Sequence, residues 1–260
     1  MKNNINNQIN DLEKKELKIL NKKEIIKDKF SPIFDKISSK VPDKLKSTLD
    51  SAFYKGFLLV FENGTKYIEK MYDKEKIQIE HSENNCYIEN SASRKNLKIM
   101  DKHAKKSKLI NTSISTIEGA GLGLLGMGLP DVPLFIAMIL KTIYEIALSY
   151  GFKYESDDEK KYILSLICAA LTNGETQGKY SIKVDEIAYK IEHNIKINYD
   201  LEEQIKETSN ILSDSLLVPK FVQGIPIVGV VGSITNYNVI NKISKFSTIK
   251  YKKRYLNNKL

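Results

Sequence analysis

The 260-residue chain has no tryptophan, two cysteines, three histidines and six prolines. Cys86 and Cys168 lie far apart, and neither has a thiol or imidazole nearby at the spacing of a metal or redox motif. The histidines His81, His103 and His193 are too widely separated to form a helical ligand pair. We therefore expect no metal, no disulfide and no cofactor.

Signals for export or lipid attachment are also missing. The N-terminal region is polar and charged, without the apolar run of a secretory signal peptide. Lys2 stands where N-myristoylation needs glycine, and Lys259-Leu260 is no prenylation box. These features predict a cytoplasmic protein.

Catalytic motifs are scarce as well, and no Ser-His-Asp or Cys-His spacing predicts a catalytic residue. Residues 121–126 match the G-x-G-x-x-G pattern of dinucleotide sites, which needs a strand before it and an unbroken helix after it. The preceding residues have a helical pattern, and Pro130 and Pro133 would break the following helix. We therefore interpret the glycines as positions of close helix packing, as in small-xxx-small motifs. The candidates are Gly119, Gly123, Gly229 and Gly232.

Positive charge is abundant and unevenly distributed. Lysine and arginine total 41 against 32 acidic residues, a net charge of +9. No acidic residue follows Asp214, and the basic cluster from Arg94 to Lys108 contains only Asp101. Such clusters are typical either of solvated helix faces or of contact with an anionic surface. The residues that we predict to meet anionic lipid are Lys242, Lys245, Lys250, Lys252, Lys253 and Arg254. No nucleic-acid-reading motif accompanies them, so we do not expect a nucleic-acid partner.

Apolar periodicity predicts helices and no strand pairs. Ser31-Pro32 and Val41-Pro42-Asp43 are expected breaks, 77–92 an expected loop, Gly151 an expected C-cap, and Ser156 or Asp157 an expected N-cap. The predicted fold is all-α, a single compact bundle of about eight or nine helices. It comprises an N-terminal helical extension, 1–42, and a main domain, 43–260. The predicted helices cover 3–29, 43–73, 93–117, 133–150, 157–173, 183–197, 200–217 and 234–256.

Two apolar segments that contain glycine and proline, 119–140 and 216–234, are expected at the centre of the bundle. Each approaches the length of a membrane span, but polar residues within them disfavour full insertion, since a central Asp costs about 2.5–3.5 kcal/mol. Burial in the core and insertion into one leaflet remain open alternatives. Asp131, Lys220 and Asn236 form a candidate polar core site if these segments converge.

In their order, several local patterns resemble the EcsC family over roughly residues 45–256. The first are Phe53/Phe57/Phe61 with Gly64-Thr65, Leu129-Pro130-Asp131-Val132-Pro133, Tyr150-Gly151 and Asp157-Asp158-Glu159. The later ones are Val218-Pro219-Lys220-Phe221, Ile225-Pro226-Ile227-Val228-Gly229, Gly232, Asn236 and Arg254-Tyr255-Leu256. The resemblance implies a bacterial, largely helical protein of a family named for its link to an ABC-type exporter, with no established activity. The chain departs from the family pattern at Leu129-Pro130, where the family often has Ala before Asp-Leu/Ile-Pro, and in its first 40 or so residues.

Together these features predict a non-enzymatic protein that acts at the inner face of the cell membrane. Its expected partner is the anionic membrane surface or a membrane protein complex. The alternative is an enzyme that acts on a lipid or another apolar substrate. A third hypothesis is a soluble partner-binding module with an apolar surface patch.

Overall fold

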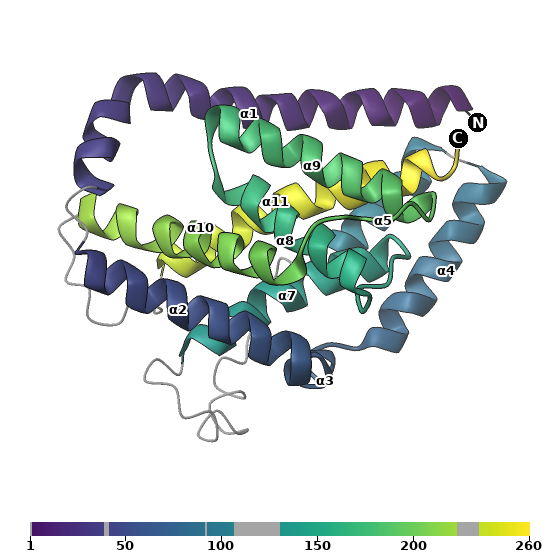
Figure 1. Ribbon diagram of the computed structural model, residues 1–260. Coiled ribbons are helices and arrows are strands. Elements are labelled where there is room, and N and C mark those ends of the chain that lie inside the picture. The colour runs from purple at the N-terminus through teal and green to yellow at the C-terminus, as the bar shows by residue number, and fades with distance from the viewer. Residues whose placement is uncertain (1, 39–41, 92, 107–130, 223–233) are drawn as a thin grey trace.

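The computed structural model describes residues 2–38, 42–91, 93–106, 131–222 and 234–260. These residues form α-helices and no strand, which confirms the all-α prediction (Figure 1). The helices are α1 (Lys2–Ser38), α2 (Asp43–Leu59), α3 (Thr65–Glu69), α4 (Lys74–Asn90), α5 (Arg94–Lys106), α7 (Asp131–Ser149), α8 (Asp157–Leu171), α9 (Gly174–Glu192), α10 (Leu201–Val222) and α11 (Ile234–Asn257).

The core is built around α7 and α8. Every residue of α8 from Tyr162 to Leu171 is buried, because this stretch contains no charged side chain on any face. α8 packs against α9, α10 and α11, while α7 packs against α2, α4 and α11. Within the described residues, Val132–Ser149 is the one helical stretch long and apolar enough to cross a membrane, and 72% of it is buried inside the protein. It therefore has the environment of a core helix.

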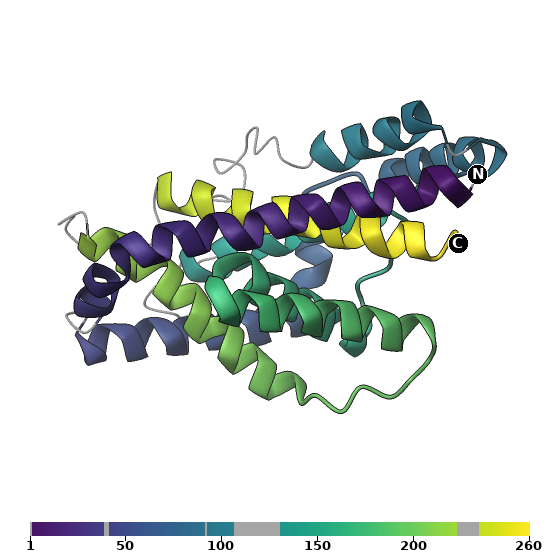
Figure 2. The same ribbon diagram turned by 90° about the horizontal axis from the view of Figure 1, so that it is seen from above.

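α1 lies along one side of the bundle, against α9, α10 and α11 (Figures 1 and 2). Ile5, Ile9, Leu12 and Glu16 recur every three or four residues and are buried there. The expected break at Ser31-Pro32 is not a helix end, since α1 continues to Ser38. Figure 1 shows the last part of α1 turned away from the axis of the first part, as is common where a helix contains proline.

Two other expectations need correction. The helix predicted over 43–73 is interrupted by a π-helical turn, Val60–Gly64, which separates α2 from α3. The loop predicted over 77–92 is α4, which starts where the Asp73 side chain accepts a hydrogen bond from the Lys76 N–H at 2.9 Å. Only Asn84 and Ile88 of α4 are buried, so the helix has almost no apolar periodicity.

α9 begins nine residues before its predicted start at 183. The buried positions of its first half include Gln177 and Ser181, and their polar side chains conceal the apolar stripe.

Predicted helix ends with specific cap chemistry are confirmed. After α7, Gly151 has φ = 83°, its N–H donates to the Leu148 carbonyl at 2.9 Å, and the Phe152 N–H donates to the Ala147 carbonyl at 2.9 Å. This is the Schellman arrangement, which requires a left-handed residue and therefore favours glycine. At the start of α8, the Ser156 hydroxyl accepts a hydrogen bond from the Glu159 N–H at 3.2 Å.

Candidate functional site

The basic run near the end of α11 lies inside the protein. Lys250 is only 1% exposed, and its ammonium nitrogen lies 2.6 Å from Glu16 Oε1 and 2.9 Å from Asp185 Oδ1. It also donates to the carbonyl of Ser181 at 3.0 Å. These partners belong to α1 and α9, which flank α11. A buried ammonium needs such pairing because an isolated charge is strongly destabilised away from water.

The other charges of this run are paired in the same way. Lys252 Nζ lies 2.8 Å from Asp101 Oδ2, and Lys253 Nζ lies 3.0 Å from an Asp185 oxygen. The Arg254 guanidinium contacts Glu159 and Glu192, each at 2.6 Å, and covers the Phe152 ring.

The expectation that Lys250, Lys252, Lys253 and Arg254 meet lipid phosphates therefore does not hold in this fold. Three of them are buried, and the side chain of Lys253 is only 18% exposed. Charge counting failed here because all of their carboxylate partners come from earlier parts of the chain. Lys242 and Lys245 are exposed, and their lipid contact stays a prediction.

The polar core site predicted from the sequence lies at three helix ends. Asp131 is the first residue of α7, Lys220 is near the end of α10, and Asn236 is near the start of α11. Their side chains lie outside the part of the structure that is described, as do Gly119, Gly123, Gly229 and Gly232.

Close helix packing occurs at a glycine that sequence analysis did not single out. A Cβ added to Gly56 of α2 would lie 2.6 Å from Ile136 Cδ1 and 3.5 Å from Val132 Cγ1 of α7. Glycine thus permits α2 to approach α7 closely. Its position between the buried rings of Phe53 and Phe57 was the available sequence signal.

The described residues contain no metal cluster, and the apolar-run cysteine, Cys168, is not reactive. No group of three or more histidine, cysteine or acidic side chains among them could hold a metal ion. Cys168 is buried with its Sγ 3.3 Å from Thr208 Oγ1, and burial raises the pKa of its thiol to about 12. Such a thiol is protonated at neutral pH and is a poor nucleophile.

Three tyrosines, Tyr72, Tyr144 and Tyr154, form a cluster near the junction of α3 and α4. Their separation along the sequence did not predict that they would meet. The Tyr72 and Tyr154 hydroxyls lie 2.6 Å apart, and the Tyr154 hydroxyl donates to Glu69 at 2.7 Å. Lys74 donates to the same Glu69 oxygen at 2.7 Å, and Tyr144 stacks on Tyr154 with ring centroids 3.8 Å apart. Burial raises the pKa of both Tyr72 and Tyr154, so neither is suited to proton transfer at neutral pH. The cluster fastens the α3–α4 junction to the segment after α7.

The surface with the clearest functional character lies on α5. Leu97 and Met100 are each 1% exposed and hold the helix to the body. Asp101, the acidic residue of α5, is directed inward, where it accepts hydrogen bonds from Lys252 at 2.8 Å and from the Tyr150 hydroxyl at 3.1 Å. The outward face is therefore left without an acidic side chain of its own helix.

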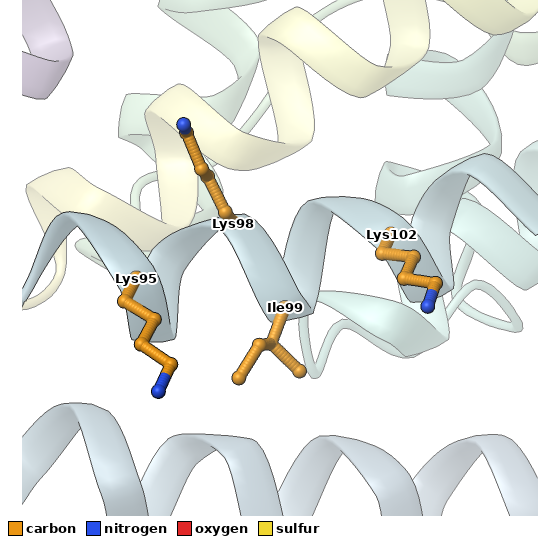
Figure 3. A pocket seen from close by; sticks show the side chains of 4 residues that line it. All are labelled: Lys95, Lys98, Ile99 and Lys102. Atoms are coloured by element: carbon orange, nitrogen blue, oxygen red, sulfur yellow. The ribbon is translucent and has the colours of Figure 1, made fainter.

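That outward face, here called the α5 basic face, consists of Lys95, Lys98, Ile99 and Lys102. All four are exposed, and they line a hollow of about 410 Å³. At about 100° per residue they fall within an arc of about 100°. Figure 3 shows Lys95, Ile99 and Lys102 pointing to one side of the helix and Lys98 to another. Within the described part of the chain, no ion pair joins these lysines to a carboxylate.

An acidic groove lies elsewhere on the molecule, between α2 and α10. The Tyr54 hydroxyl donates to Glu202 across it at 2.5 Å. Figure 2 shows α5 and the N-terminal half of α10 on opposite sides of the bundle, so the two hollows carry opposite charge on different faces. The groove encloses about 550 Å³ and is lined by Asp50, Ser51, Tyr54, Asp200, Glu202, Glu203, Lys206 and Asn210.

Comparison with known proteins gives a match to one family model. The model of the EcsC protein family matches residues 6–256, a range that includes most of α1. An uncharacterised protein of Bacillus subtilis (strain 168), YdbA, is 28% identical over 164 residues, which are 61% of this chain and 58% of that protein. The chain thus spans somewhat more than half the length of this relative. No solved structure matches.

Proposed function

The chain belongs to the EcsC protein family, and we propose that it is a non-enzymatic protein that binds an anionic membrane surface through the α5 basic face. The observation that carries this proposal is a set of three exposed lysines around Ile99, with no carboxylate partner within the described residues. The inner face of the cell membrane is the expected surface, because its leaflet carries anionic lipid. An exporter complex in that membrane is the partner that the family resemblance suggests.

The charges predict weak and reversible attachment. Each lysine near an anionic leaflet contributes about 1 kcal/mol, so three contribute about 3 kcal/mol, or roughly a hundredfold preference for anionic over neutral lipid. Ile99 is 37% exposed and adds a small apolar contact at the level of the headgroups. Screening by salt should weaken most of this binding, since the Debye length is about 10 Å at 0.1 M.

The distribution of charge supports one orientation at the membrane. The acidic groove between α2 and α10 lies on the side of the bundle opposite α5 (Figure 2). An anionic surface would attract α5 and repel the groove, which directs the α5 basic face toward the lipid. The groove would then face away from the membrane.

Vesicle co-sedimentation tests the proposal with two variants of equal charge. The variant K95E/K98E/K102E reverses the α5 basic face, while K44E/K55E/K66E reverses three exposed lysines of α2 and α3. The first should lose binding to anionic vesicles, and the second should keep most of it. Equal loss in both would show that net charge alone matters. Failure of the wild-type protein to bind at low salt would refute the proposal.

The alternative of a lipid-modifying enzyme rests on Asp131, Lys220 and Asn236. Their side chains lie outside the described structure, so this alternative stays a prediction.

A further inference from the structure

We propose that the hollow beside α5 is a saturable site for a phosphate monoester carried by an amphiphile, such as a lipid with a terminal phosphate. Lys95 and Lys102 would hold the phosphate, Ile99 would contact the apolar part of the ligand, and Lys98 would add a nearby positive charge. This inference rests on the proposed membrane role and goes beyond it, because it names a single binding site and its ligand class.

The geometry of the helix brings the groups together. Lys95 and Lys102 are seven residues apart, which is about 10.5 Å along the axis, and their directions differ by about 20°. Ile99 lies between them on nearly the same line, as Figure 3 shows. The flexible four-carbon stems of the two lysines let both ammonium groups close over one point above Ile99.

Charge balance favours a monoester over a diester. The three ammonium groups repel one another, and no ion pair in the described residues joins any of them to a carboxylate. A phosphate monoester carries about −1.5 to −2 charge at pH 7 and offers three acceptor oxygens. A phosphodiester carries a single negative charge and should compensate the three lysines less well.

The shape of the hollow favours a lipid-borne phosphate over the free ion. The hollow is open to solvent, and its volume of about 410 Å³ has room for a phosphate group together with the glycerol of a lipid. Exposed Ile99 gives the lining an apolar element between charged groups. Inorganic phosphate would leave the Ile99 side chain in water, whereas the glycerol and first methylene groups of a lipid would cover it.

Calorimetric titration of the full chain with soluble short-chain lipids tests the site. We expect one dihexanoyl phosphatidic acid per chain, bound at least about tenfold more tightly than dihexanoyl phosphatidylglycerol or inorganic phosphate. The substitution I99S should weaken the binding of phosphatidic acid at least about fivefold and leave the binding of inorganic phosphate unchanged. K95Q/K102Q should remove binding of both, whereas K55Q/K66Q should leave both unchanged. Because all four lysines and Ile99 are exposed, none of these variants removes a core side chain.

The possible failures can be told apart. If phosphatidic acid binds no better than phosphatidylglycerol while anionic vesicles still bind, α5 is a diffuse cationic surface and the site is refuted. If inorganic phosphate binds as tightly as phosphatidic acid and I99S has no effect, the lipid assignment is wrong. If wild-type protein does not bind anionic vesicles at all, the proposed function itself fails.

Discussion

The contact between Gly151 and His81 offers the sharpest test of the packing. Gly151 has φ = 83°, and a Cβ added there would lie 2.4 Å from His81 Nε2 and 2.7 Å from Cε1. The imidazole cannot easily move, because its Nδ1 lies 3.1 Å from the Ser149 carbonyl and its ring packs edge-on against Tyr255. The substitution G151A therefore introduces both a backbone penalty and a steric one.

The two penalties have known sizes. The left-handed conformation costs about 1–2 kcal/mol for a residue with a Cβ. Overpacking of a fixed neighbour adds about 1–3 kcal/mol. We expect G151A to lower the free energy of unfolding by about 2–5 kcal/mol in urea titrations followed by circular dichroism. The control is G178A in α9, where nothing lies within 4 Å of the added Cβ, so alanine should instead stabilise the helix by about 0.5–1 kcal/mol.

A double-mutant cycle separates the contributions. In an H81A background the steric part is gone, so G151A should cost only the backbone part, about 1–2 kcal/mol. If G151A costs the same with and without the imidazole, the proposed contact does not exist. If G151A is no more destabilising than G178A, the left-handed cap itself is wrong.

Two further predictions concern buried charge and pH. The substitution E16Q removes one carboxylate partner of the buried Lys250 and should lower the free energy of unfolding by about 3–5 kcal/mol. The substitution D214N breaks the exposed pair with Lys46 and should lower it by less than about 1 kcal/mol. Urea midpoints of the two variants measure this difference. Burial lowers the pKa of His81 in the fold, so the unfolded chain binds a proton more readily, and stability should fall as pH drops below about 6.5. The difference between urea midpoints at pH 7.5 and 5.5 should be smaller in H81Q than in wild type, and an equal difference would contradict this origin.

Sequence reasoning succeeded where the determining contacts are local. Apolar periodicity predicted α2, α7, α8, α10 and α11, because each of these helices presents apolar side chains to the core. The caps at Gly151 and Ser156 were predictable, since a cap is settled by a few neighbouring residues. α4 escaped prediction because a helix that buries only Asn84 and Ile88 has no periodic signal.

The surface could be predicted only in part, because long-range pairing decides which charges remain outside. The sequence identified two basic clusters but could not show that Glu16, Asp101, Glu159, Asp185 and Glu192 surround the cluster on α11. Nor could it show that Asp101 is directed inward, which leaves the lysines of α5 unopposed on the outside. These facts depend on how α1, α5, α8 and α9 meet α11.

The ion pair between Glu16 and Lys250 has a consequence for synthesis of the chain. The two partners lie 234 residues apart in the sequence, which at roughly 5–20 residues per second corresponds to about 12–47 s of translation. For most of that interval α1 has been made, but α11 has not. The carboxylate of Glu16 therefore has no ammonium partner from Lys250 until α11 is made, whereas α9 and α10, which also contact α1, are made earlier. The contact between α1 and α11 therefore forms only after α11 has been translated.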